Sequence, residues 1–285
     1  LSDADAASAA VLAELVVGVV SAAGNRALRD IIRETWGREQ QVVVDRGRAL
    51  VRVFFFLADG GAAREEHDQF GDIVLLRELD ESFSNIWLKT AAIMKFGADF
   101  FDVQKSLTAE DRTVRFVMKC DDDAFLDIDA VVDDLLAGPV VGVYWGHVMA
   151  QVEPNRDRSD KYFVPADVFS MEYYPPYARG MAYVLSEDLV RPLGNALHSG
   201  RLDPFPYRED VSVGLYLFAL ARDGVVRVAP RQRKDAMPID IGQRCLAAGA
   251  NSSAALLALH RFRPEDAPCF WRLIEDRRRA GRGRP

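Results

Sequence analysis

Three consecutive aspartates, Asp121 to Asp123, follow the apolar run 114–118 after Lys119 and Cys120. Apolar runs of this kind are typical of buried strands, and three carboxylates at the end of one strand repel each other. Clustered carboxylate oxygens suit Mg²⁺ or Mn²⁺, which would relieve the repulsion and leave open positions for a phosphate-bearing ligand. Alternatively, Asp123 could cap a following helix. Capping needs only one aspartate, so the run indicates a site for a metal or for a nucleotide with its metal.

A second acidic pair, Glu209 and Asp210, stands at the start of an apolar helical stretch. Interaction with the helix dipole would by itself explain carboxylates at this place. Beside a metal site, however, a separate acidic site could supply the general base that a group-transfer enzyme needs. His260 follows the apolar run 254–259 and is either a structural histidine or a further metal ligand.

Basic residues could complete a nucleotide site. Arg29 and Arg33 lie four residues apart, on one face of an expected helix. Arginine favours planar and bidentate contacts, so both could meet a phosphate or a base. Alternatively, they pair with Asp30 or Glu34, or lie in solvent. Lys89, inside a longer helical stretch, leaves the same two interpretations open.

The elements that must position these residues alternate along the first half of the chain. The patterns predict strands over 12–20, 51–58, 72–76 and 114–120, and helices over 27–36, 62–70 and 86–101. Strands separated by helical patterns imply parallel pairing in an α/β sheet with helices on both faces. Ligands of such sheets bind beyond the carboxyl ends of the strands, where the aspartate run lies.

The pattern changes after about residue 140. Residues 140–149 and 161–164 resemble strands of a different sort, and 210–221 returns to helix. The Tyr-rich segment 173–183 could stack on sugar rings or pack in the core. No Pro- or Ser-rich linker separates the halves. We therefore expect one domain over 1–285, with a nucleotide-binding half at about 11–138, a second half at about 139–275, and a basic tail at 276–285.

Composition narrows the class of protein. The 285 residues are 49% hydrophobic, which is enough for one large globular domain, and the net charge of −7 argues against a nucleic-acid partner. The longest apolar stretch, 9–24, carries Glu14 and is too short to cross a bilayer. We expect Cys120 to be a buried free thiol, whereas Cys245 and Cys269 could pair in an oxidising compartment.

Seven segments, in order, resemble motifs of the β-1,3-galactosyltransferase family of Golgi glycosyltransferases. They are RALRDIIRETWG (26–37), FFFLADG (54–60), FGDIVLLRELDESFSNIWLKT (70–90), FVMKCDDDAFLDID (116–129), YYPPYARGMAYVLS (173–186), YREDVSVG (207–214) and LHRFRPEDAPCFW (259–271). The resemblance covers about residues 13–272. Phe83 stands where the family usually has Tyr, and Ile86-Trp87 where Leu-Thr is usual, while the acidic motifs are intact.

The resemblance implies a GT-A fold, a UDP-sugar donor, Mn²⁺ or Mg²⁺, and inversion at the anomeric carbon. The metal would be held by Asp123 and His260, and the base would be Asp210, with Glu209 beside it to bind or orient the sugar. The residues expected near the uridine, ribose or diphosphate are Arg29, Arg33, Lys89, Asp121 and Asp122. Those expected near the acceptor or sugar are Tyr174, Tyr177 and Gly180.

The resemblance favours transfer of galactose to a glycan hydroxyl in a β-1,3 linkage. It also implies the Golgi lumen, with a membrane anchor expected upstream of Leu1 in the full-length protein. A β-1,3-N-acetylglucosaminyltransferase is the nearest alternative. A sugar-binding protein that has lost catalysis is a second, against which the intact Asp123, Asp210 and His260 argue. A metal-dependent nucleotide hydrolase is a third, made less favourable by the expected acceptor segment at 173–183.

Overall fold

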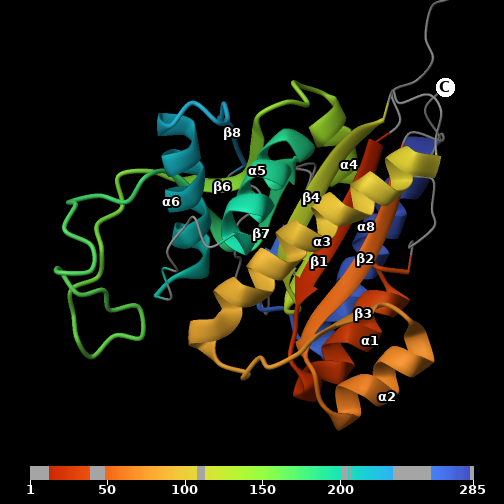
Figure 1. Ribbon diagram of the computed structural model, residues 1–285. Coiled ribbons are helices and arrows are strands. Elements are labelled where there is room, and N and C mark those ends of the chain that lie inside the picture. The colour runs from red at the N-terminus through yellow and green to blue at the C-terminus, as the bar shows by residue number, and fades with distance from the viewer. Residues whose placement is uncertain are drawn as a thin grey trace, which may run out of the picture.

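The computed structural model describes residues 13–38, 49–107, 113–199, 205, 207–233 and 258–282. Seven strands form one sheet in the order β3-β2-β1-β4-β7-β6-β8, and helices cover both of its faces (Figure 1). The strands of this sheet are β1 (Ala13–Val20), β2 (Ala49–Ala58), β3 (Ile73–Leu76), β4 (Val114–Asp121), β6 (Val143–Met149), β7 (Tyr177–Ser186) and β8 (Ala229–Gln232). The mixed α/β class expected from the sequence is confirmed.

Described helices account for most of the remaining regular structure. They are α1 (Arg26–Glu34), α2 (Gly61–Phe70), α3 (Ile86–Leu107), α4 (Ile128–Leu136), α5 (Glu187–His198), α6 (Glu209–Arg222) and α8 (Ala267–Arg282). Residues 276–282, expected to belong to a basic tail, continue α8. Among the residues placed by the structure, no helix is both long and apolar enough to span a membrane.

The direction of strand pairing changes halfway across the sheet. Strands β3, β2, β1 and β4 pair in parallel, as the alternation of strands and helices predicted. Strand β7 then pairs antiparallel with both β4 and β6, and β8 pairs parallel with β6. In the β1–β4 ladder Val20 lies opposite Asp121, so the chain after β1 emerges beside the aspartate run. The ends of the central strands therefore bring together the segments that build the site.

Strand β1 supplies both hydrophobic cores. Its Leu15, Val17 and Val19 pack in the core that includes side chains of α1, α4 and α8. Val16 and Val20 point to the opposite face and pack in the core that includes α3, α5 and α6. Successive side chains of a strand alternate between faces, so a continuous apolar run is what a strand covered on both sides requires. In Figure 1, α3 and α5 cross the near face of the sheet and α8 lies behind it.

One local prediction from the sequence is wrong, and one alternative considered there is not observed. Residues 161–164 form no strand, because the Asp160 side chain accepts the Tyr162 N–H at 2.8 Å and the segment turns. The helix after the aspartate run is capped by Asp127, not by Asp123: Asp127 Oδ1 accepts the Ala130 N–H at 3.3 Å. A short strand, β5 (Ala124–Leu126), intervenes and pairs antiparallel with β9 (Ala258–His260).

The cysteines agree with the expectation wherever they are described. Cys120 is a buried free thiol, and burial raises its pKa, which keeps it protonated at neutral pH. Cys269 is disulfide-bonded. Its expected partner Cys245 lies outside the residues that the structure describes.

Candidate active site

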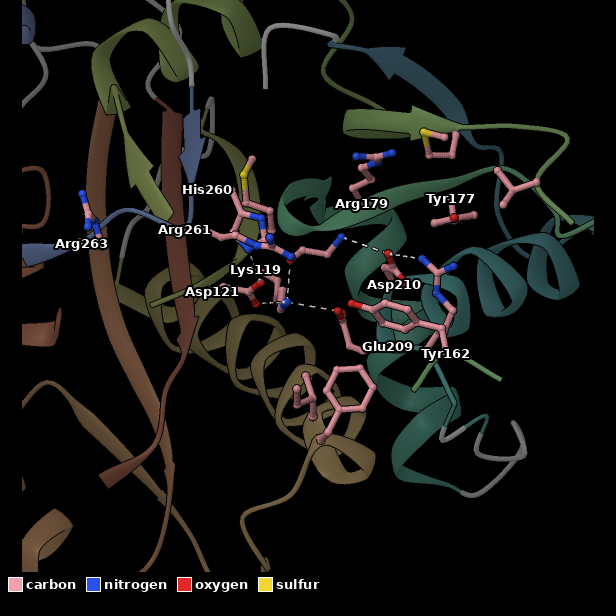
Figure 2. A pocket seen from close by; sticks show the side chains of 17 residues that line it. Lys119, Asp121, Tyr162, Tyr177, Arg179, Glu209, Asp210, His260, Arg261 and Arg263 are labelled. Atoms are coloured by element: carbon pink, nitrogen blue, oxygen red, sulfur yellow. Dashed lines mark hydrogen bonds and ion pairs between the residues drawn. The ribbon is translucent and has the colours of Figure 1, made fainter. Parts of the chain in front are cut away.

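A cavity of about 1010 Å³ opens where β4, β7, α6 and β9 meet. Its wall includes the ends of these elements, the start of α3, and the long loop between β6 and β7. Figure 2 shows His260 and Arg261 on one side of the cavity and Asp210 and Tyr177 on the other, with Lys119 and Glu209 between them. The two acidic motifs predicted from the sequence thus face one space.

The first acidic group consists of Asp121, Asp123 and His260. One ligand atom from each residue lies within 4.8 Å of the other two. His260 Nε2 is 3.3 Å from Asp123 Oδ1 and 3.7 Å from Asp121 Oδ2. Burial raises the pKa of Asp121, an effect that Lys119 opposes. Two carboxylates and an imidazole at this spacing form a suitable donor set for a divalent cation.

Pairing of β5 with β9 explains how His260 reaches the aspartates. Ala124, which follows the aspartate run, lies opposite His260 in the ladder. The Phe262 N–H donates to the Asp123 carbonyl at 3.0 Å, and Phe262 packs against Phe125. The last residues of the site are therefore placed by a strand pair that joins positions more than 130 apart in the sequence.

Asp122 points away from the other two aspartates. It accepts hydrogen bonds from Ser21 Oγ at 2.6 Å and from Asn25 Nδ2 at 2.9 Å. Burial raises its pKa, and these two donors oppose that effect. It does not line the cavity. Instead of the predicted place near the ribose and diphosphate, Asp122 here ties the end of β4 to the segment after β1.

The predicted nucleotide residues Arg29 and Lys89 converge on the same segment. Arg29 is fully buried, donates to Ser21 Oγ at 2.8 Å and pairs with Glu66 at 2.9 Å. Lys89 Nζ donates to the Ser21 carbonyl at 2.6 Å and to Glu81 at 2.6 Å. Neither lines the cavity. Their donors are satisfied inside the protein, so here they support Ser21 rather than present charge to a ligand.

Arg33 pairs with acidic side chains of the protein, which was the alternative to nucleotide binding in the sequence analysis. It pairs with Asp30 at 2.8 Å and, through Nε, with Asp72 at 2.8 Å. Its guanidinium also lies 3.9 Å from the ring centroid of Phe70. These contacts join α1 to the segment before β3 and the end of α2, away from the cavity wall. No contact with the other predicted partner, Glu34, is among those described.

Lys119 and Glu209 form a buried ion pair between β4 and α6. Lys119 Nζ lies 2.7 Å from Asp121 Oδ1, 2.6 Å from the Gly180 carbonyl and 3.1 Å from Glu209 Oε2. Although burial opposes its charge, Asp121 and Glu209 raise the pKa of Lys119, so the ammonium stays charged. Burial raises the pKa of Glu209, and Lys119 opposes this.

The second oxygen of Glu209 is also occupied. Oε1 accepts from Tyr183 Oη at 2.7 Å and from Thr90 Oγ1 at 3.0 Å. A carboxylate with donors on both oxygens is held in one position. Of the two roles predicted for Glu209, orienting the site fits this geometry better than direct binding of a sugar.

Asp210 is the more exposed of the two carboxylates at the start of α6, with 14% of its side chain exposed against 9% for Glu209. Its Oδ2 accepts from the Gly180 N–H and from Arg208, each at 3.3 Å, and its Oδ1 accepts the Val211 N–H at 2.9 Å. Arg208, not Asp210, occupies the N-cap position and makes no side-chain cap. The hydrogen bonds orient Asp210 without enclosing it, which suits a proton acceptor.

The residues predicted to bind acceptor or sugar separate into two groups. Tyr177 and Gly180 line the cavity, as predicted for a binding role. Tyr174 does not: it is 3% exposed and packs with Phe169 and Phe205 in a small core. For Tyr174 the packing interpretation is the one that the structure supports.

Several cavity residues were missed from the sequence. They are Tyr162, Arg179, Arg208 and Arg261. The Arg208 guanidinium lies 5.3 Å from the ring centroids of both Tyr162 and Tyr177. Arg208 precedes the Glu-Asp pair and Arg261 follows His260, so adjacency to a motif could have indicated these two. Tyr162 lies in the middle of a long loop, where no periodic pattern points to a site.

Known proteins resemble this chain in sequence over most of its length. A family profile described as Galactosyltransferase matches residues 27–223. "Beta-1,3-galactosyltransferase GALT1" of Arabidopsis thaliana is 28% identical over 272 residues, covering 94% of this chain and 38% of the relative. "N-acetyllactosaminide beta-1,3-N-acetylglucosaminyltransferase 4" of Mus musculus is 31% identical over 256 residues, covering 88% and 67%. "Hydroxyproline O-galactosyltransferase GALT5" of Arabidopsis thaliana is 32% identical over 211 residues, covering 72% and 29%. The chain thus spans from 29% to 67% of the length of these relatives.

Proposed function

Because this chain belongs to the galactosyltransferase family, we propose that it transfers a hexose from a UDP-sugar to a glycan hydroxyl, with inversion and a β-1,3 linkage. The observation that carries the proposal is the arrangement of two acidic sites at one cavity. Asp121 and His260 line one side, with Asp123 beside them, and Asp210 lines the other. An inverting displacement needs an electrophilic site for the leaving group and a separate base for the acceptor.

The first site would hold a divalent cation, Mn²⁺ or Mg²⁺. Asp121, Asp123 and His260 fit such an ion because their ligand atoms converge within 4.8 Å and the donors are oxygen and nitrogen. When bound, the ion supplies Lewis-acid neutralisation of diphosphate charge. Lys119 holds Asp121 in place through the contact at 2.7 Å.

Asp210 would accept the proton of the acceptor hydroxyl as that oxygen attacks the anomeric carbon. The Gly180 N–H and Arg208 fix its orientation. Glu209 is less suited to this role, because it pairs with the buried Lys119 ammonium and its side chain is 9% exposed, against 14% for Asp210. No covalent intermediate is required when the base lies on the acceptor side.

We place galactose first as the transferred sugar and N-acetylglucosamine second. Relatives named for each activity match this chain at similar identity, 28% and 32% for galactosyltransferases and 31% for an N-acetylglucosaminyltransferase. The identity of the transferred sugar is therefore to be determined by direct assay. UDP release should be measured from a panel of UDP-sugars, with and without glycan acceptors, followed by linkage analysis of the product.

We expect acceptor-dependent UDP release, fastest with UDP-galactose, and a β-1,3-linked product. Faster transfer from UDP-N-acetylglucosamine to every acceptor would replace galactose with the second candidate. UDP release that no acceptor accelerates would instead favour a nucleotide-sugar hydrolase. Binding without any turnover would favour a sugar-binding protein.

We also propose that the full-length protein works in the Golgi lumen, anchored by a segment upstream of Leu1. The disulfide at Cys269 supports an oxidising compartment, where such bonds persist. Localisation of the complete gene product by microscopy and protease protection tests this. A cytosolic product would contradict it.

A further inference from the structure

Arg261 has an unusual backbone conformation at the edge of the cavity. Three non-glycine residues in the described part of the chain have positive φ: Glu78, Gln151 and Arg261, with Arg261 at 56°. Of these, only Arg261 lines the cavity. Residues other than glycine seldom adopt a positive φ, because their Cβ atom then crowds the backbone. Strained residues of this kind cluster at ligand sites, so the conformation calls for a functional explanation.

The neighbours of Arg261 impose this conformation. His260 is fixed in β9 opposite Ala124. Phe262 is fixed by its N–H bond to the Asp123 carbonyl at 3.0 Å and is 2% exposed. The chain must therefore turn sharply at the single residue between two anchored ones. Glycine would make that turn without strain, yet the residue present is arginine.

The guanidinium of Arg261 also has no ion-pair partner among the residues that the structure describes, and its side chain is exposed. Two other arginines of the cavity wall are paired: Arg208 with Asp210, and Arg263 with Glu265 and Asp266. Arg261 thus places an uncompensated positive charge next to His260 and the candidate cation site. A diphosphate, which carries several negative charges, could contact both the arginine and a cation held at that site.

We propose that Arg261 binds the diphosphate of the nucleotide-sugar donor beside the candidate metal ligands and stabilises UDP as it leaves. In the step, the bond between the anomeric carbon and the β-phosphate oxygen breaks, and its electron pair stays on that oxygen. The acceptor oxygen forms the new bond and its proton passes to Asp210. Arg261 thus acts where negative charge develops, which is where a preorganised donor contributes most. The inference rests on the proposed function.

The test uses R261G, R261K and the matched control R263A. R261G removes the charge and at the same time relieves the backbone, whereas R263A removes an arginine of the same cavity wall that is already paired. Each variant is titrated calorimetrically with UDP and with uridine, in Mn²⁺ and again in excess chelator, and its melting temperature is measured. Uridine lacks the phosphates and therefore reports on the rest of the site.

We expect R261G to melt no lower than the wild type while its UDP affinity falls about tenfold, a loss typical of one charge-assisted hydrogen bond. Uridine binding and R263A should match the wild type, and R261K should recover part of the UDP affinity because it restores a point charge. Wild-type UDP affinity in R261G, or an equal loss in R263A, would overturn this inference alone. Absence of UDP binding by the wild type would contradict the proposed function as well.

Discussion

At the scale of single residues, identical sequence motifs have different roles because their surroundings differ. Helices α5 and α6 both begin with a Glu-Asp pair, Glu187-Asp188 and Glu209-Asp210. Asp188 accepts the Gly142 N–H at 2.9 Å, whereas Asp210 faces the cavity. The same two residue types thus serve as helix-start carboxylates in one place and as a candidate catalytic centre in the other.

This pair of helices provides a controlled test of the base. D210N should keep the shape of the side chain, the melting temperature and the UDP affinity, but transfer should slow by about 10²–10⁴-fold because a general base is lost. D188N changes the corresponding residue of α5 and should leave the rate unchanged. Turnover, UDP affinity and melting should be measured on the same samples. If D210N retains more than about a tenth of the wild-type rate, well short of that loss, Asp210 is not the base.

Glu209 should matter chiefly through Lys119. In E209Q the buried ammonium loses one of its two carboxylates, and breaking a buried pair from one side typically costs about 3–5 kcal/mol. Because Asp121 remains as a partner, we expect the lower end, about 3 kcal/mol of unfolding free energy. Denaturant unfolding measures this.

A suitable control for E209Q is E265Q, since Glu265 is 62% exposed in its pair with Arg263. An exposed pair contributes about 0–1 kcal/mol, so this variant should unfold almost as the wild type does. Equal stability losses in E209Q and E265Q would show that the Lys119 pair is not a structural link.

At the scale of elements, α3 packs closely against the sheet because β1 has a glycine, Gly18, at the point of contact. A Cβ at Gly18 in β1 would lie 2.4 Å from a side-chain carbon of Ile93 in α3. G18A should therefore destabilise the protein by about 1–3 kcal/mol, as overpacking typically does. Thermal or denaturant unfolding provides the measurement.

Two further variants identify the cause. I93A removes all three Ile93 carbons that would lie within 3 Å of the new Cβ, so the double variant G18A/I93A should lose less stability than the sum of the two single variants. G24A adds the same methyl group at a position with no heavy atom within 4 Å and should be close to neutral. A G18A variant that is as stable as G24A would mean that α3 and β1 pack less closely than described.

At the scale of the whole molecule, the sequence predicted the elements well and their long-range partners poorly. The parallel strands β1 to β4 follow from apolar runs separated by helical patterns, and the second half of the sheet did not. Whether β7 inserts between β4 and β6 depends on tertiary packing that no local pattern records. The strand predicted at 161–164 failed for a local reason, because side-chain oxygens of Asp157 and Asp160 accept backbone N–H groups and favour turns.

The candidate site likewise contains residues whose place the sequence predicted and residues whose contacts it did not. The acidic motifs and His260 were predicted, because their residue types and their place at strand or helix ends indicate chemistry. Arg29, Lys89 and Asp122 instead surround Ser21, a buried residue immediately after β1. Spacing along a helix shows that a side chain shares a face with another, but it does not show whether that face meets solvent or a buried carboxylate.

The central claim is that Asp123 and His260 hold the divalent cation on which sugar transfer depends. Its most direct test is the rate of transfer from the preferred UDP-sugar as Mn²⁺ is titrated into metal-free wild type, D123A, H260A and the control H67Q, whose histidine lies in α2 and contacts the Ile73 carbonyl of β3, away from the cavity. We expect no transfer by the wild type or H67Q without metal, recovery of both on titration, and little or no recovery of D123A and H260A. Full wild-type activity in excess chelator, or D123A that responds to Mn²⁺ as the wild type does, would contradict the account.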